Sequence, residues 1–101
     1  MTNITPEEVK ERLDSGESLN LVDVRQPEEN TAFNIGGILL PLGKIQSMQT
    51  DDIDELRDKE VICYCQSGNR SGTAALFLEQ MGFSHVENLI GGMLAWREKF
   101  D

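Results

Sequence analysis

The run of residues 60–65, EVICYC, is the sequence feature that most constrains the fold. Its β-branched and aromatic residues favour a strand. Because the run is apolar without alternation, it is expected to be buried on both faces, which is typical of parallel sheets covered by helices. Residues 71–83, SGTAALFLEQMGF, then place apolar side chains three and four positions apart and end near Gly82, as in an amphipathic helix. The sequence therefore predicts a buried strand, a short polar loop and a helix in direct succession.

The rest of the chain alternates between helical and extended patterns. Thr5 is suited to cap a helix, with Pro6 at its first position and Glu8 three residues after the cap. Strands that alternate with helices predict an α/β fold with a mainly parallel central sheet and helices on both faces. With 101 residues, a single domain over residues 1–101 is expected. The expected elements are helices near 5–16, 26–33, 71–83 and 91–100, strands near 19–25, 36–42, 60–65 and 85–90, and irregular helical turns within 44–58.

Charge and hydropathy exclude several classes of function. The chain carries 18 acidic and 9 basic residues, a net charge of −9, so it lacks the basic footprint needed to bind nucleic acids or anionic membrane surfaces. No apolar run approaches the roughly 18 residues needed to cross a bilayer. The N-terminus shows neither the basic start nor the apolar core of a signal peptide, so a cytoplasmic location is expected.

The two cysteines, Cys63 and Cys65, occupy alternate positions of the predicted strand. Strand residues two positions apart are separated by about 6.6 Å, at the outer limit for a disulfide, so no intrachain bond is expected. With His85 as the single histidine, no metal site is predicted. Cys63 is interpreted as a small apolar core residue.

Cys65 is instead the candidate catalytic residue, because it ends the strand just before a helix. In open parallel sheets, ligands bind beyond the carboxyl ends of the strands. The N–H groups of such a loop and the positive end of the helix lower the pKa of a thiol and can bind an anion. A glycine in the loop permits a left-handed backbone, and an arginine adds a permanent charge. The candidate binding residues are Gln66, Ser67, Gly68, Asn69 and Arg70.

Three ordered motifs make the chain resemble the single-domain, rhodanese-like sulfurtransferases. They are LVDVRQPEE at 21–29, VICYCQSGNRSGTAALFLEQMGF at 61–83 and HVENLIGGMLAW at 85–96. The resemblance implies a rhodanese-like domain with about five strands. It also implies that Cys65 takes the outer sulfur of a small anionic donor, such as thiosulfate, as a persulfide held by the loop amides. The acceptor would be cyanide in vitro, or a thiol or protein cysteine, and no metal or cofactor is needed.

Other positions of the resemblance are expected to support this site. Asp23 is expected to hold loop backbone nearby, and Arg25 is expected to form an ion pair with Glu28 or Glu29. Ser71 is expected to support the site from the start of the helix.

Two further motif segments concern the surroundings of the site. Gly91 and Gly92 are expected to let a loop pass close to the active-site wall, and Trp96 is expected to belong to the core. The family has a glycine-histidine-isoleucine-proline-glycine run where this chain has FNIGG, so Asn34 and Gly36 replace the histidine and the proline. This departure bears on the pocket rim and the acceptor, but not on the cysteine chemistry.

Three alternative functions follow from the same residues. Phosphatases and arsenate reductases of related fold have five residues between cysteine and arginine, whereas this loop has four and forms a narrower cradle. The domain could also act as a persulfide carrier or a protein-interaction module without turnover. A redox pair of Cys63 and Cys65 is a third alternative, disfavoured by their separation.

Overall fold

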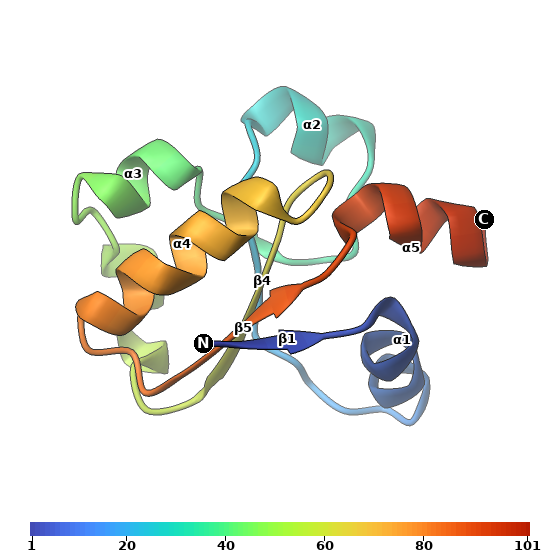
Figure 1. The fold of residues 1–101 in the computed structure, drawn as a ribbon, viewed down its shortest axis with the longest axis horizontal. Helices are drawn as coiled ribbons and strands as arrows, with labels where there is room; N and C mark the ends of the chain where they lie inside the picture. The colour runs from blue at the N-terminus through green and yellow to red at the C-terminus, as the bar shows by residue number, and fades with distance from the viewer.

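The computed structural model describes residues 1–101 and consists of five strands and six helical segments. Figure 1 shows the helices arranged around a central sheet, with the N-terminus near the middle of the view and the C-terminus at the right-hand end of α5. In chain order the elements are β1 (Thr2–Ile4), α1 (Pro6–Asp14), β2 (Leu21–Asp23), α2 (Pro27–Ala32), β3 (Ile38–Leu39), α3 (Leu42–Gln46), the 3₁₀ helix η1 (Asp51–Leu56), β4 (Glu60–Tyr64), α4 (Asn69–Gln80), β5 (His85–Leu89) and α5 (Gly92–Phe100).

The sheet has the order β1-β5-β4-β2-β3, and every strand pair is parallel. Parallel neighbours need crossover connections, which the helices provide. The predicted α/β class is therefore confirmed, with a sheet of five strands and helices between them (Figure 1). No helix is both long enough and apolar enough to cross a bilayer.

Two apolar clusters cover the two faces of the sheet. One packs β2 and β4 against α3, η1 and α4, and the other packs the sheet against α1 and α5. Strand β4 contributes to both, because Val61 and Cys63 belong to the first cluster and Ile62 and Tyr64 to the second. The two-sided burial predicted for this strand is confirmed. Trp96 lies in the second cluster, as predicted.

Helix α1 begins as its sequence predicts. The hydroxyl of Thr5 accepts a hydrogen bond from the N–H of Glu8 at 3.1 Å, and the Glu8 carboxylate accepts one from the N–H of Thr5 at 3.3 Å. Pro6 occupies the first turn, where its missing N–H needs no partner. These contacts are local, so the sequence alone determines them.

Two predicted strands are shorter than expected. The strand expected at 19–25 is limited to Leu21–Asp23, and the one expected at 36–42 is limited to Ile38–Leu39. Strand β3 pairs only with β2, and this pairing extends over two residue pairs. Leu42 begins α3 instead of continuing the strand.

Two features of the fold were not apparent from local patterns, the strand β1 and the start of helix α4. Strand β1 was not predicted, because only Ile4 of its three residues is buried and its one partner, β5, lies at the other end of the chain. Helix α4 begins at Asn69, two residues before the expected start at Ser71. The earlier start brings the first helical turn closer to Cys65.

Candidate active site

The sulfur of Cys65, directly after β4, is surrounded by hydrogen-bond donors of the following loop. The Gly68 N–H donates to Sγ at 3.1 Å, and the N–H and the hydroxyl of Ser71 lie at 3.4 and 3.3 Å. The Ser67 N–H contributes as well. Burial is the largest single influence and opposes ionisation, but the hydrogen bonds together outweigh it and lower the pKa of Cys65. The loop is therefore suited to hold a thiolate.

The backbone of this loop depends on a left-handed glycine. Gly68 has φ +101° immediately before α4, a conformation that residues with a Cβ rarely adopt. A Cβ at this position would also lie 3.2 Å from the backbone nitrogen of Gly91. The geometry that turns the Gly68 N–H toward sulfur is therefore available to glycine and strained for other residues.

The first turn of α5 holds the other side of the loop. The N–H of Met93 donates to the carbonyl of Cys65, and the N–H of Leu94 donates to the carbonyl of Gln66, both at 2.9 Å. A Cβ on Gly92 would lie 2.7 Å from the carbonyl carbon of Gln66. The close approach expected for the glycine pair is confirmed at this position. Two helix N-termini thus fix the loop, α4 on its sulfur side and α5 on its carbonyl side.

Cys65 is enclosed but not surrounded by hydrocarbon alone. Only 1% of the residue is exposed, and it belongs to the apolar cluster that contains Val24 and Ala74. Its sulfur nevertheless faces the N–H groups described above. A wholly apolar environment would raise the pKa of the thiol, whereas this one lowers it.

Ser71 connects the sulfur to β5 through a residue that the sequence did not single out. The Ser71 hydroxyl contacts both Cys65 Sγ and Asn88 Oδ1, although it has one proton to donate. The Asn88 side-chain amide donates to the carbonyl of Gly68 at 3.2 Å, which fixes its orientation. Asn88 therefore positions both Ser71 and the glycine turn. The available signal was a polar residue within the strand predicted at 85–90.

Arg70 does not reach toward the sulfur. Its guanidinium forms a bidentate ion pair with Glu29 on α2, at 2.7 and 2.8 Å. This hydrogen-bonded pair is the main cause that raises the pKa of Arg70 and lowers that of Glu29 to about 2. Arg70 contributes positive charge near the mouth of the site while it ties α4 to α2. The predicted bidentate donors are present, but a protein carboxylate occupies them.

Asp23 and Arg25 form an ion pair beneath the site, and neither side chain is more than 2% exposed. The Asp23 carboxylate accepts from both the backbone N–H and the guanidinium of Arg25. Arg25 was expected to pair with Glu28 or Glu29, and this expectation is wrong, because the aspartate two residues earlier is closer. The guanidinium also donates to the carbonyl of Phe33 and, at 3.4 Å, to the Gln66 side chain. The pair therefore links β2 to the loop.

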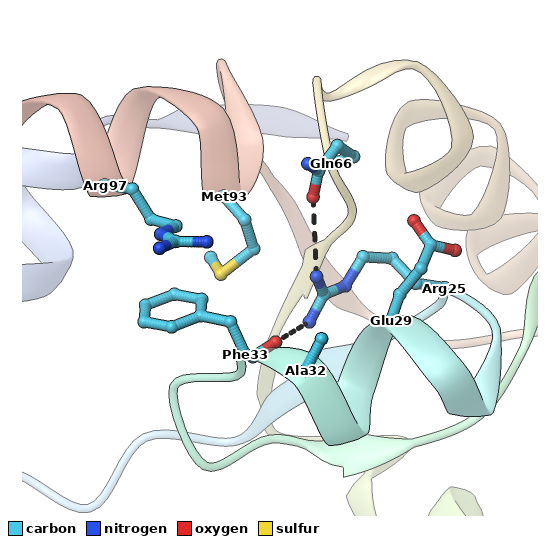
Figure 2. A pocket seen from close by; sticks show the side chains of 7 residues that line it. All are labelled: Arg25, Glu29, Ala32, Phe33, Gln66, Met93 and Arg97. Atoms are coloured by element: carbon cyan, nitrogen blue, oxygen red, sulfur yellow. Dashed lines mark hydrogen bonds between the residues drawn. The ribbon is translucent and has the colours of Figure 1, made fainter.

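A small cavity of about 130 Å³ opens beside the loop. Figure 2 shows the guanidinium of Arg25 between the Gln66 side chain and the Phe33 carbonyl, with Arg97 on the far side near Met93. The Arg97 guanidinium lies 4.7 Å from the centre of the Phe33 ring. Sequence reasoning identified only part of this lining, since α5 and the end of α2 meet the loop only in the fold. The lining residues are Arg25, Glu29, Ala32, Phe33, Gln66, Met93 and Arg97.

The remaining predicted positions lie around the rim. Ser67 and Asn69 are exposed and present no side-chain contact to the sulfur. Asn34 bonds within its own turn, donating to Asn30 and accepting from the N–H of Gly36 at 2.8 Å. Gly36 has φ +95°, which the proline of the family pattern could not adopt. The departure from that pattern therefore changes the backbone of the segment next to Phe33.

Cys63 and the metal-ligating side chains are separate from this site. Cys63 is fully buried, and burial raises its pKa to about 12, so it remains a thiol. Both cysteines are free. A group of metal-ligating side chains occurs only at the other end of the strands, where β4 and β5 begin.

Comparison with known proteins identifies the family. The model of the Rhodanese-like domain matches residues 5–99, so the chain belongs to the rhodanese-like domain family. The chain is 37% identical over 97 residues to a sulfurtransferase of Allochromatium vinosum, covering 95% of this chain and 88% of that protein. A rhodanese-like domain protein of Staphylococcus aureus has a crystal structure that matches with a TM-score of 0.82 and 31% identity, covering 95% of this chain and 91% of that one.

A further relative is larger. YrkF of Bacillus subtilis, a candidate sulfur carrier protein, is 37% identical over 97 residues. The match covers 95% of this chain but 51% of YrkF. The chain thus spans about half the length of this curated relative, and 25% of the length of others. Membership of the family is shown over nearly the whole chain, and several of its relatives are named for sulfur transfer or sulfur carriage.

Proposed function

We propose that this chain is a sulfurtransferase that carries sulfane sulfur as a persulfide on Cys65. The observation that carries the proposal is the convergence of the Gly68 N–H and both donors of Ser71 on one sulfur atom. Such donors stabilise a thiolate before reaction and a negatively charged outer sulfur after it. The same environment lowers the pKa of Cys65, so no separate base is required.

The reaction has two balanced steps when thiosulfate is the donor. The Cys65 thiolate attacks the outer sulfur, the S–S bond of thiosulfate breaks, and sulfite leaves with the electron pair. Cys65 then carries a second sulfur with one negative charge. A thiophilic acceptor, such as cyanide or a thiolate, attacks that outer sulfur, and the Cys65 thiolate is the leaving group. Neither step requires an oxidant or a reductant, which is typical of sulfane transfer.

The residues around Cys65 would divide the work of binding. The amides of residues 66–70 would hold the outer sulfur, with Gly68 providing the required turn. Arg70 would attract an anionic donor by its charge, because its hydrogen-bonding groups are engaged by Glu29. The Asp23–Arg25 pair would keep Gln66 in place.

A persulfide carrier is the second candidate, favoured by the similarity to YrkF. A carrier would form the same persulfide but release it only to a particular protein thiol. Phosphatase activity is not favoured, because Arg70, the arginine that would bind a phosphate, is paired with Glu29.

Mass spectrometry after incubation with thiosulfate tests the shared step. We expect a gain of about 32 Da on Cys65 that cyanide removes, and no gain in Cys65→Ser. Several thiocyanate molecules formed per protein would indicate a turnover enzyme. A persulfide that yields no more than about one thiocyanate per protein, and that passes its sulfur to a particular protein thiol, would indicate the carrier. Absence of the added sulfur would contradict both.

A further inference from the structure

A second cluster of reactive side chains lies at the opposite end of the strands from Cys65, where β4 and β5 begin. Glu60 and His85 are the first residues of the neighbouring strands β4 and β5, and they are paired in the parallel register. Glu87 is two residues after His85, so both side chains extend from the same face of β5. One ligand atom from each of the three lies within 4.8 Å of the others. In Figure 1 the starts of these two strands lie at the end of the sheet that is away from the loop containing Cys65.

One carboxylate oxygen of this cluster, Oε1 of Glu87, lacks a hydrogen bond, although the Glu87 carboxyl group is also hydrogen-bonded to Glu60. The side chain of Glu87 is 10% exposed, and its Oε1 is fully buried without any hydrogen bond. The imidazole Nε2 of His85 lies 3.3 Å from this oxygen. A buried polar atom without a hydrogen bond is rare in folded proteins and calls for an explanation, which a bound ion would provide here.

The separation of these atoms fits a metal ion between them. Nitrogen and oxygen ligands lie about 2.0–2.2 Å from Zn²⁺, so two ligands of a tetrahedral ion are about 3.4 Å apart. The 3.3 Å between His85 Nε2 and Glu87 Oε1 fits that separation, and it is equally the length of a direct ion pair in the metal-free protein. Because all three ligand atoms lie within 4.8 Å, Glu60 would need to move by on the order of 1 Å to join them. We infer that His85, Glu87 and Glu60 form a three-ligand site for a first-row transition-metal dication such as Zn²⁺.

Ligand chemistry indicates which metals this site would prefer. Imidazole nitrogen suits zinc, copper, nickel and iron, whereas Mg²⁺ and Ca²⁺ prefer ligand sets made only of oxygen. Water would complete the coordination on the exposed side, since the His85 side chain is 56% exposed. The site therefore selects Zn²⁺ over Mg²⁺.

The guanidinium of Arg12 sets the expected strength of binding. It donates to both oxygens of Glu60 and, at 3.0 Å, to Glu17, so it holds Glu60 beside the site and opposes the small movement that metal binding requires. Each carboxylate oxygen keeps a second lone pair for a metal. The guanidinium charge repels a cation, and Glu17 offsets part of that charge. Binding is expected in the micromolar range or weaker, well short of the affinity of a closed four-ligand zinc site.

Calorimetric titration with zinc chloride tests the inference in untagged protein. The titration uses the Cys65→Ser background, since a thiolate would itself bind zinc. We expect one equivalent of Zn²⁺ to bind, and millimolar Mg²⁺ not to compete. His85→Asn and Glu87→Gln should each weaken binding by about tenfold or more, because each removes one of three ligands.

A matched control separates this site from general attraction to an acidic protein. Asp52→Asn removes one exposed carboxylate from η1 that is not part of the cluster, and should leave zinc affinity unchanged within about twofold. Thermal unfolding without metal checks that each variant is folded. Amide resonances should shift at the starts of β4 and β5 and not in η1.

Three results would overturn the inference. They are no stoichiometric binding, equal binding in all variants, and a loss in Asp52→Asn as large as in Glu87→Gln. In the first case the cluster would be a pair of glutamates sharing a proton, with no role in metal binding. The experiment is independent of sulfur transfer, because it is done without the Cys65 thiol.

Discussion

Removing one hydroxyl from the sulfur cradle should change the pKa of Cys65 by a measurable amount. In Ser71→Ala the hydroxyl at 3.3 Å from Sγ is lost, while the N–H groups of Gly68 and Ser71 remain. This hydroxyl is the strongest of the influences that lower the pKa of Cys65. Because a thiolate is stabilised by fewer donors in the variant, its pKa must rise.

The size of the change follows from the hydrogen bond that is lost. A hydrogen bond to a charged group contributes about 1.5–3 kcal/mol. The low end applies, because sulfur is a weak acceptor and the hydroxyl also contacts Asn88. About 1.4 kcal/mol corresponds to a rise of about one pKa unit. Below the wild-type pKa, the thiolate fraction, and with it the alkylation rate, should fall about tenfold.

The assay is the pH dependence of thiolate absorbance, with the rate of iodoacetamide alkylation as a second measurement. Cys63 does not interfere, since its pKa is raised to about 12 by burial. The matched control is Ser67→Ala, which removes a hydroxyl from the same loop but keeps the N–H that faces the sulfur. An unchanged pKa in Ser71→Ala, or an equal rise in Ser67→Ala, would refute the role assigned to the hydroxyl.

Further predictions concern the core, the loop and the ion pair at the rim. Cys63→Ala should keep sulfur transfer within about twofold and lower the free energy of unfolding by about 1 kcal/mol, measured by urea denaturation; a large loss of transfer would revive a redox role. Gly92→Ala should cost about 2–3 kcal/mol and impair persulfide formation, because its Cβ would overlap the active-site loop, whereas Gly43→Ala, with open space around it, should be tolerated. Titration followed by NMR should show the carboxyl of Glu29 with a lowered pKa of about 2. The Arg70 ion pair therefore stabilises the fold fully at pH values above the ordinary carboxyl pKa, and this contribution is lost as the pH falls toward 2. In Arg70→Gln that titration should return toward the ordinary glutamate range; no change would mean that the ion pair is not formed in solution.

Local patterns in the sequence were sufficient for the elements that depend on nearby residues. The capping of α1 by Thr5 and Glu8 requires contacts only three residues apart, and the sequence predicted it. The strand that ends before Cys65, and the left-handed turn at Gly68, likewise follow from adjacent residues. Strand β1 could not be predicted in this way, because its pairing partner is more than 80 residues away in the chain.

The partners of the charged and polar side chains required the fold. Arg70 is 41 residues from Glu29, and nothing local distinguished that carboxylate from its neighbours. Arg25 illustrates the opposite error, since a partner two residues away was overlooked in favour of more distant acids. Asn88 became part of the site only because β5 lies beside β4 in the sheet.

That a thiol follows a buried strand at the start of a helix could be predicted from neighbouring residues alone, because hydrophobic periodicity and glycine placement are local properties of the chain. How the loop is held depends on long-range packing, which places N–H groups of α5 against the carbonyls of Cys65 and Gln66. The cluster at the starts of β4 and β5 also depends on the fold, because the register of the two strands brings Glu60 beside His85. Such contacts depend on which elements pack together, and that choice is made by the burial of the whole core.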